Sequence, residues 1–317
     1  MPDEAMSSLN IRELKVTFDT PLGTVKAVDD VSFELNAGET LALVGETGCG
    51  KSVIAHSILK LLPANAEIKG QLLFRNQNLL KLGEKELAQI RGKEISLIMQ
   101  NPALALNPVY SIGHQMTEPL MVHEGMRKAN AILKAKDLLK RLRFIGPDVA
   151  TRAYPFEMSG GMKQRILIGI SVILNPKIII ADEPTTGLDS RLRDMVLEEL
   201  RLVKEMDRSS MIFISHDLNA AREISDRIAI MYAGEILEIG STAEFFKEPF
   251  HPYSKKLLDS LPERGFNPIP GTSPSVIHPP EGCKFHPRCP SRKEICSKES
   301  PDFVRIKDRD IKCVLYS

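Results

Sequence analysis

The order of apolar and polar positions along the chain predicts strands first and a mixture of helices and strands afterwards. Apolar and polar residues alternate at 14–18 and 31–35, as expected for strands with one buried face. Residues 41–44 are all apolar and precede a glycine-rich turn, which favours a fully buried strand. A helix is predicted over about 51–62, because Pro63 ends the helical pattern there.

The middle of the chain changes to a helical pattern and then returns to alternating strands and helices. Apolar residues recur at helical spacing within 131–142, and we expect most of 101–165 to be helical. From Ile166 to about Phe246 strand and helix patterns alternate again, which predicts an α/β core. The chain shows no internal repeat and no low-complexity segment.

The segment directly after the first buried run matches the phosphate-binding pattern G-x-x-x-x-G-K-[ST]. Glycines let backbone N–H groups turn towards a phosphate without a Cβ in the way, and the following helix adds a positive dipole. We expect Lys51 to hold the β- and γ-phosphates of a nucleotide and Ser52 to ligate Mg²⁺. The segment consists of Gly45, Glu46, Thr47, Gly48, Cys49, Gly50, Lys51 and Ser52.

A second predicted strand, at 178–182, ends in two carboxylates. Its run of isoleucines indicates a parallel strand buried on both faces, whose carboxyl end opens towards a ligand. We expect Asp182 to bind Mg²⁺, directly or through water, and Glu183 to orient or deprotonate the water that attacks the γ-phosphate. Alone, an apolar run followed by Asp-Glu ends many ordinary strands, so this interpretation depends on the glycine loop.

Between these two elements, residues 158–165 read MSGGMKQR, and this segment resembles the signature sequence of ABC-type ATPases. Further family motifs lie on either side of it in the expected order: Gln100 precedes it, and Asp189 and then His216 follow it. The resemblance covers nearly the whole chain. It implies a P-loop NTPase core of the RecA-like type, with an antiparallel β subdomain, an inserted helical subdomain at about 101–165, and a small C-terminal cysteine-rich tail.

The resemblance also implies roles for individual residues. Glu183, Gln100 and His216 would be catalytic: Gln100 would reach the metal and the attacking water, and His216 the γ-phosphate. Asp189 belongs to the nucleotide-binding residues. Phe18 matches the position at which such ATPases stack an aromatic ring on adenine. A phenylalanine in a strand can equally be a core residue, and Val25 lies close enough to compete for this role.

The signature implies that the ATPase works as a dimer. Ser159, Gly160 and Gly161 would clamp the γ-phosphate of ATP held by the opposite subunit, and an ordinary helix N-cap is the alternative for this segment. The implied partner is a second ABC ATPase subunit, identical or homologous, in a head-to-tail dimer that shares two nucleotide sites. Two departures from the family pattern are Met162, in place of a common Gln, and Cys49, in place of the usual Ser.

The resemblance implies further partners in a membrane. Two transmembrane permease subunits would contact the helical subdomain, and an extracytoplasmic peptide-binding protein would deliver the substrate. Met116, Leu120 and Met121 can form either the core of this subdomain or a groove for a partner's helix, and periodicity does not separate the two.

The C-terminal segment indicates which group of ABC-type ATPases the chain resembles. Residues 251–253, HPY, resemble an element that follows the ATPase core in oligopeptide and dipeptide importers, and a proline-rich linker at 262–280 comes next. Disulfides are not expected in a reducing cytosol, so a site of four thiolates is the better interpretation. The cysteines are separated by five, six and sixteen intervening residues, which lack the C-x₂-C knuckle of structural zinc and favour a [4Fe–4S] cluster. Similar peptide-importer ATPases carry such a cluster in this tail. Zinc and four unligated thiols remain alternatives. The cysteines are Cys283, Cys289, Cys296 and Cys313.

Charge and hydropathy restrict where the protein is expected to lie and which partners it is expected to bind. Lys and Arg total 42 and Asp and Glu total 41, so the net charge of +1 gives no electrostatic case for a nucleic-acid partner. No uninterrupted apolar tract is long enough to cross a membrane. Residues 1–6 lack the plan of a secretory signal. We therefore expect a peripheral protein at the cytoplasmic face of the cell membrane, with an ATPase domain at 1–245 and a C-terminal extension at 246–317.

Together these patterns predict an ATPase subunit that energises import of di- or oligopeptides. Alternatives are an importer ATPase for nickel or glutathione, a soluble ABC ATPase of translation or DNA repair, and an iron–sulfur redox sensor with an attached ATPase.

Overall fold

The computed structural model describes residues 7–317, so the N-terminal segment 1–6 and the expectation based on it lie outside the described residues. The chain divides into two compact units. Unit 1 consists chiefly of residues 82–213, with 36–38 added. Unit 2 consists of residues 9–35, 39–81 and 214–317. The domain boundaries expected from the sequence remain predictions.

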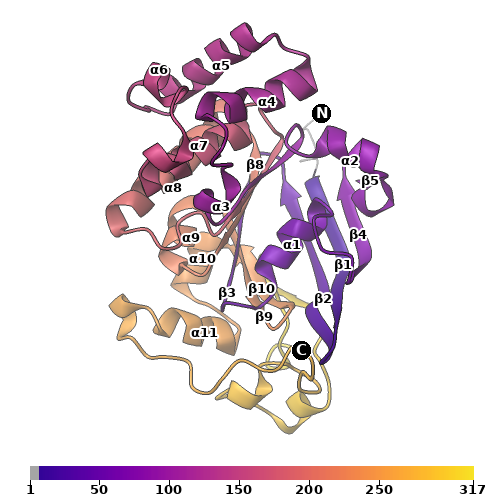
Figure 1. Cartoon of the computed structure of the whole chain (residues 1–317). Coiled ribbons are helices and arrows are strands. Elements are labelled where there is room, and N and C mark those ends of the chain that lie inside the picture. Colours follow the sequence, from indigo (N-terminus) through magenta and orange to yellow (C-terminus); the bar gives the residue numbers. More distant parts are fainter. Residues whose placement is uncertain (1–6) are drawn as a thin grey trace, which may run out of the picture. The chain divides into compact units, whose positions relative to one another are not determined.

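Unit 2 contains an antiparallel sheet in the order β2-β1-β4-β5, drawn in indigo and violet in Figure 1. The register of β1 on β4 runs from Leu9 opposite Phe74 to Phe18 opposite Ala66. Buried apolar residues alternate with more exposed polar residues in the predicted segments of β1 and β2, as the sequence predicted. The strands are β1 (Ser7–Thr20), β2 (Gly23–Asn36), β4 (Ala66–Phe74) and β5 (Gln77–Asn78).

A second group of strands in unit 2 has the order β11-β12-β10-β9-β3. β3 pairs in parallel with β9, and every residue of β3 is buried, as predicted for the apolar run at 41–44. β9, β10, β12 and β11 continue the group as antiparallel neighbours. These strands are β3 (Thr40–Gly45), β9 (Arg227–Tyr232), β10 (Glu235–Ser241), β11 (Val304–Ile306) and β12 (Arg309–Ile311).

The first helix of unit 2 ends earlier than the sequence predicted. It stops at Ile58, because Lys60 adopts a left-handed conformation with φ 48°. The Leu61 and Lys60 N–H groups then donate to the carbonyls of His56 and Ser57, the pair of hydrogen bonds of a Schellman motif. The helices of unit 2 are α1 (Lys51–Ile58), α9 (Leu218–Ile224), α10 (Thr242–Lys247) and α11 (Pro252–Asp259), with short 3₁₀ turns η1 (Leu79–Lys81), η3 (Pro262–Arg264), η4 (His286–Arg288) and η5 (Glu294–Ser297).

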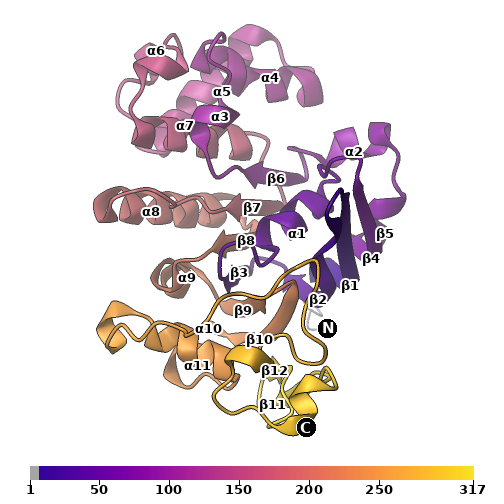
Figure 2. The same cartoon turned by 60° about the horizontal axis from the view of Figure 1, so that its bottom comes forward.

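Unit 1 combines parallel strands with a group of helices, which is visible at one end of Figure 2. β7 lies between β8 and β6 and pairs in parallel with β6, from Ile178 opposite Ile95. The strands are β6 (Ile95–Ile98), β7 (Ile178–Asp182) and β8 (Ser210–Ser215). The helices are α2 (Glu84–Ile90), α3 (Pro102–Ala105), α4 (Ile112–Glu124), α5 (Lys128–Arg141), α6 (Pro147–Ala150), α7 (Gly160–Val172) and α8 (Ser190–Asp207), with the 3₁₀ turn η2 (Pro155–Glu157).

The helical stretch of unit 1 resolves one alternative left open by the sequence. Met116 and Leu120 on α4 are completely buried, so they belong to the core of the unit. Met121 and Val122, on the same helix, are 42% and 70% exposed. The core interpretation therefore holds for the first two residues and not for Met121.

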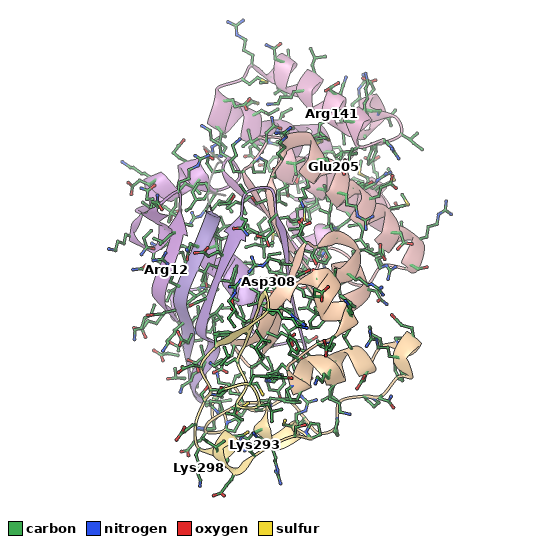
Figure 3. All side chains as sticks on the ribbon, turned by 180° about the vertical axis from the view of Figure 1, so that it is seen from behind. Arg12, Arg141, Glu205, Lys293, Lys298 and Asp308 are labelled. Carbon is green, nitrogen blue, oxygen red and sulfur yellow. The ribbon has the colours of Figure 1, made fainter. Side chains whose placement is uncertain are left out.

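The C-terminal tail packs on the edge of unit 2 through an ion pair that is almost completely buried. Arg309 on β12 lies 3.2 Å from Glu238 on β10, and its guanidinium covers the ring of Phe250. Glu238 also accepts hydrogen bonds from the N–H groups of Phe250 and His251. The carboxylate is thus satisfied on all sides, as burial requires. Figure 3 draws the side chains as sticks and labels Lys293, an exposed residue of the tail.

His251 is a buried helix cap whose second ring nitrogen makes no hydrogen bond. Its Nδ1 accepts from the Tyr253 N–H at 3.0 Å at the start of α11, while Nε2 is buried without a hydrogen-bond partner. Burial, helped by the charge of Lys255, lowers the pKa of His251 from 6.5 to about 3. The imidazole therefore stays neutral in the folded chain.

This burial predicts a loss of stability in acid. Between pH 6.5 and 3 the unfolded chain protonates His251 and the folded chain does not, so the free energy of unfolding falls as the pH falls through that window. The slope from this one group is at most about 1.4 kcal/mol per pH unit. In the variant His251→Asn, which retains a capping side chain, we expect a shallower slope in urea unfolding measured from pH 7 to 4. Equal slopes for both proteins would contradict the assignment.

Candidate nucleotide site

The glycine-rich segment forms a turn between β3 and α1 that two close backbone contacts define. A Cβ on Gly45 would lie 2.0 Å from the Met231 carbonyl oxygen, and a Cβ on Gly50 would lie 2.2 Å from that of Ala27. Gly50 has φ 104°, a conformation that residues with a Cβ rarely adopt. The loop thus has the glycine-dependent shape of a phosphate cradle.

Lys51 begins α1 and folds back over the loop. Its side chain is almost completely buried, and Nζ donates to the carbonyl oxygens of Gly45 at 2.8 Å and Glu46 at 3.0 Å. Cys49 is also buried, and this burial raises the pKa of its thiol. Cys49 is therefore a neutral packing residue in this structure, whereas the lysine ammonium lies across the loop.

Two further predicted contacts of the nucleotide also lie in unit 2. Phe18, near the end of β1, is only half-buried, so its ring is not part of the closed core. His216 follows β8 and is exposed. The next residue, Asp217, caps α9 by accepting hydrogen bonds from the Asn219 and Ala220 N–H groups.

The acidic residues lie at the carboxyl end of β7 in unit 1. Asp182 is the last residue of the strand, and Asp182 and Glu183 are both buried. Glu183 has φ 50°, an uncommon conformation for a residue with a side chain. Its carboxylate accepts a hydrogen bond from the Thr186 hydroxyl, and its carbonyl accepts from the Thr186 N–H. Such local strain is typical of functional positions.

Gln100 lies at the same edge of unit 1 as the carboxylates. β6 and β7 run parallel with Ile98 opposite Ala181, so the residues that follow both strands emerge together. Gln100 is exposed at this edge. Asp189 lies farther along the chain, where its side chain caps α8 by accepting from the Leu192 N–H at 2.9 Å.

The signature segment forms the start of a helix, as predicted. Ser159 is the N-cap of α7 and its hydroxyl accepts from the Met162 N–H at 3.3 Å. Ser159 and Gly160 are exposed, and Gly161 is half-buried. In the single chain Ser159 is thus a helix cap, and its action on a nucleotide held by another subunit stays a prediction. The residues predicted to act on one nucleotide are divided between the two units.

The four cysteines of the C-terminal tail line one cavity in unit 2, which we call the tail cavity. All five cysteines of the chain are free thiols. Burial raises the pKa of Cys283 to about 11 and raises those of Cys289 and Cys313. The other side chains that line the cavity come from His251, Pro252, Phe285, His286, Ser291, Val314 and Leu315.

The expected metal at these cysteines is not supported by the positions of the side chains. Within residues 7–317, no three His, Cys, Asp or Glu side chains are placed as a set that could hold a metal ion. The four thiols share a cavity without adopting the positions of metal ligands. Neither the iron–sulfur cluster nor zinc is established by the structure.

Two contacts of the phosphate loop are not predicted by the sequence. Glu46 forms an ion pair with Arg288 in the tail, and its N–H donates to the Tyr253 hydroxyl at 3.3 Å. No local pattern identifies a contact between residues 242 positions apart. The signal in the sequence is the HPY element, whose Tyr253 hydroxyl accepts the hydrogen bond from the loop.

Comparisons with known proteins agree with this geometry. Residues 28–186 match the family "ABC transporter", and residues 237–296 match "Oligopeptide/dipeptide transporter, C-terminal region". The first match spans the phosphate loop, the signature and the acidic strand.

The chain belongs to the ABC transporter family.

Relatives extend the match over almost the whole chain. It is 43% identical to the dipeptide transport ATP-binding protein DppD of Bacillus subtilis (strain 168), with 97% of this chain and 94% of the relative aligned. It is 41% identical to the oligopeptide transport ATP-binding protein OppD of Escherichia coli (strain K12), over 94% of this chain and 90% of the relative.

A solved structure supports the predicted fold class. The ATP-binding cassette MJ0796, in a dimeric post-hydrolysis state bound to ADP and Pi, has a TM-score of 0.65 and 25% identity, covering 74% of this chain and 98% of its own. The α/β P-loop NTPase fold with an antiparallel sheet is therefore confirmed, and the chain is an ABC-type ATPase. None of the helices described in the structure is long and apolar enough to cross a membrane.

The glycine contacts predict different effects for two otherwise similar substitutions. Gly50→Ala places a Cβ against the Ala27 carbonyl, whereas Gly48→Ala meets nothing within 4 Å, although both glycines have positive φ. We expect Gly48→Ala to cost about 1–2 kcal/mol of unfolding free energy from its backbone conformation alone. Gly50→Ala should cost clearly more. Urea unfolding of the two variants measures the difference, and equal losses would contradict the close contact.

Proposed function

We propose that this chain is the ATP-hydrolysing subunit that energises import of di- or oligopeptides. The observation that carries the proposal is the glycine-dependent phosphate loop between β3 and α1, in a chain whose residues 237–296 match the C-terminal region of oligopeptide and dipeptide transporters. The named relatives are ATP-binding proteins of dipeptide and oligopeptide transport, which supports the same substrate class.

Nucleotide binding follows from the contacts of the loop. Its backbone N–H groups and the N-terminus of α1 favour an anionic phosphate. Lys51 would exchange the carbonyl oxygens of Gly45 and Glu46 for β- and γ-phosphate oxygens. Ser52 and Asp182 would hold Mg²⁺, whose positive charge offsets that of the phosphates. The partly exposed Phe18 is suited to stack on adenine, since its ring is accessible.

Hydrolysis would depend on the residues at the carboxyl ends of the strands. Glu183, held in its unusual conformation by Thr186, would orient or deprotonate the attacking water. Gln100 emerges at the same edge of unit 1 and would contribute to positioning that water. His216 would contact the γ-phosphate. Each role requires a position relative to the triphosphate, and catalysis here is mainly positioning and charge stabilisation.

Dimerisation would complete each site. Ser159 and Gly160 are exposed at the start of α7, which leaves them accessible to a nucleotide held by a second ATPase subunit. A related cassette has been solved as a dimer with ADP and Pi. ATP would favour the closed dimer and hydrolysis the open one, so that transport work would come from this shift in population.

Subunits in the membrane would respond to the opening and closing of the dimer through their contacts with unit 1. Leu104, Val109 and Tyr110 follow Gln100 and are 83%, 71% and 48% exposed. Exposed apolar side chains of this kind are suited to contact a partner's helix, here those of two permease subunits. The chain would then sit peripherally at the cytoplasmic face of the membrane, while an extracytoplasmic binding protein delivers the peptide.

The proposal includes a [4Fe–4S] cluster held by the four cysteines of the tail cavity, with zinc as the alternative. Four thiols line one cavity, and thiolates are the donor type that such a cluster requires. The N–H groups of Phe285, Ser291 and Leu315 donate to the sulfurs of Cys283, Cys289 and Cys313 and lower the pKa of each thiol against the effect of burial. Such N–H groups stabilise thiolate ligands. The cluster would cross-link the tail.

The proposed base predicts the behaviour of Glu183→Gln. Hydrolysis should fall by roughly 10²–10⁴-fold, because glutamine cannot accept the proton, while ATP is still bound. Size-exclusion chromatography with ATP and Mg²⁺ should then show a stable dimer. The matched control is Glu244→Gln, which changes an exposed glutamate of α10 and should hydrolyse ATP like the wild type. Wild-type hydrolysis by the Glu183 variant would show that the base is wrong.

The proposed cluster predicts the colour and iron content of the protein. Purified without oxygen, the chain should be brown and contain about four irons, measured by metal analysis and visible absorption. Cys296→Ser should lower the iron content, whereas Cys49→Ser, which changes the cysteine outside the tail, should not. One zinc per colourless chain would support the alternative, and a metal-free protein would exclude both.

A further inference from the structure

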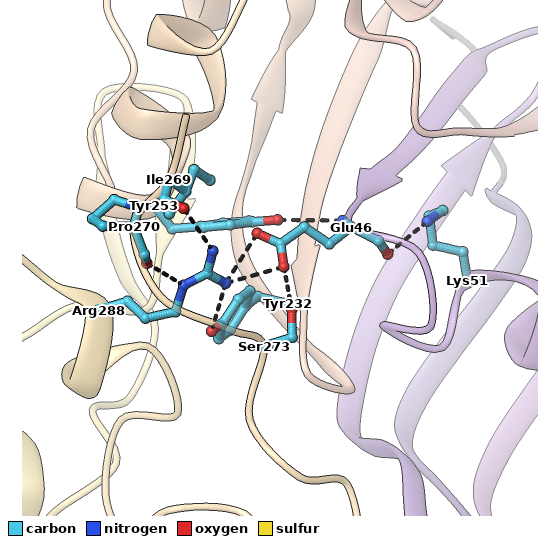
Figure 4. A network of polar contacts seen from close by, with 8 residues as sticks. All are labelled: Glu46, Lys51, Tyr232, Tyr253, Ile269, Pro270, Ser273 and Arg288. Atoms are coloured by element: carbon cyan, nitrogen blue, oxygen red, sulfur yellow. Dashed lines mark hydrogen bonds and ion pairs between the residues drawn. The ribbon is translucent and has the colours of Figure 1, made fainter. Parts of the chain in front are cut away.

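Arg288, the residue before Cys289, reaches back to the phosphate loop, as Figure 4 shows. Its Nη1 donates to both carboxylate oxygens of Glu46, at 3.1 Å and 3.0 Å. Both residues belong to unit 2. The Arg288 side chain is 8% exposed and that of Glu46 is 25% exposed. The tail therefore contacts the loop through a charge pair that is largely removed from water.

The guanidinium of Arg288 is fixed by four further contacts. Nε donates to the Pro270 carbonyl at 2.9 Å, and Nη2 donates to that of Ile269 at 3.4 Å. Nη1 also donates to the Tyr232 hydroxyl at 3.2 Å, and the guanidinium lies over the Tyr232 ring. Burial alone would lower the pKa of Arg288, but the hydrogen bonds to Tyr232 and Glu46 raise it above its ordinary value. The side chain is thus a charged and rigid fork.

Glu46 joins the tail to the lysine of the loop. Its carboxylate accepts from Arg288 and from the Ser273 hydroxyl, while its carbonyl oxygen accepts from Lys51 Nζ. Its N–H donates to the Tyr253 hydroxyl. One residue of the phosphate loop is therefore held by the linker, by α11 and by η4. A displacement of Glu46 would also displace the carbonyl that now holds Lys51.

Two physical effects connect the contact between Arg288 and Glu46 to the affinity of the loop for a phosphate ligand. First, a pair with one largely buried member is costly to break, since truncation leaves the other charge unpaired in a poorly solvated place. Second, an unpaired carboxylate at Glu46 would repel a triphosphate bound to the same loop, because like charges disfavour association. A surface ion pair would produce neither effect strongly.

We propose that Arg288 is a positioning residue for the nucleotide: it neutralises and fixes Glu46, and so makes the C-terminal tail part of the ATP site. This inference rests on the proposed function, in which the loop binds ATP. By linkage, the coupling is reciprocal, so nucleotide on the loop must also tighten the tail at Arg288.

The test measures binding of a fluorescent ATP analogue to the full-length chain, with thermal unfolding of each variant measured alongside. Arg288→Ala should raise the dissociation constant about tenfold, a coupling of the size usual between sites. Arg288→Lys keeps the charge without the fork and should lie between the alanine variant and wild type. The matched control is Arg292→Ala, which removes an exposed arginine of the same tail and should bind like the wild type.

A double substitution separates positioning from general loss of structure. If an unpaired Glu46 carboxylate is responsible, then Glu46→Gln combined with Arg288→Ala should restore part of the affinity lost in Arg288→Ala. In ATPase assays, Arg288→Ala should raise KM while kcat at saturating ATP changes less than twofold. A variant that is merely less stable would show a lower kcat as well as weaker binding, and the second substitution would not restore its affinity.

The outcomes distinguish this inference from the proposed function. If Lys51→Ala binds the analogue like wild type, the loop does not bind ATP and the proposed function fails. If Lys51→Ala loses binding but Arg288→Ala is folded and binds like wild type, only the positioning role is wrong.

If Arg288→Ala does not fold, hydrogen exchange of the wild type decides. The analogue should slow exchange at 269–273 and 286–289, and it should have no effect in Lys51→Ala. Unchanged exchange at these segments in the wild type would overturn the inference.

Discussion

The structure of unit 2 depends on the close approach of two carbonyl oxygens to the phosphate loop. Ala27 and Met231 leave no room for a Cβ at Gly50 and Gly45, so only glycine allows the turn that joins β3 to α1. This steric limit sets where α1 begins and hence where Lys51 projects. A loop built on such a limit presents its N–H groups in one arrangement before any ligand arrives, which lowers the cost of ordering on binding.

Around this loop, unit 2 keeps its charged groups paired in places with little water. Glu238 and Arg309 connect β10 to β12, and Glu46 and Arg288 connect the phosphate loop to the tail. Buried pairs of this kind add little net stability compared with apolar packing, since each charge loses its hydration. Their effect is better described as specificity: a tail segment shifted by one residue would leave a carboxylate unpaired.

Local features of the fold were predictable because nearby residues determine them. The buried strands at 41–44 and 178–182 follow from apolar runs, and the cap at Ser159 follows from hydroxyl chemistry at a helix start. The early end of α1 was not predictable, since Lys60 rather than a glycine takes the left-handed position. The burial of Met116 and exposure of Met121 depend on packing between helices, which periodicity does not specify.

The contact between Glu46 and Arg288 lies beyond any such pattern, and its chemistry suggests why charge is used there. An apolar contact would hold the tail equally well, but its energy would not change when a charged ligand binds to the loop. If phosphate binds to the loop as proposed, the electrostatic energy of the Glu46 carboxylate, which is paired with Arg288, changes when the phosphate binds or leaves. Under this proposal, binding at the loop alters the contact between the loop and the tail, because the Glu46 carboxylate pairs with Arg288 while its carbonyl oxygen accepts from Lys51.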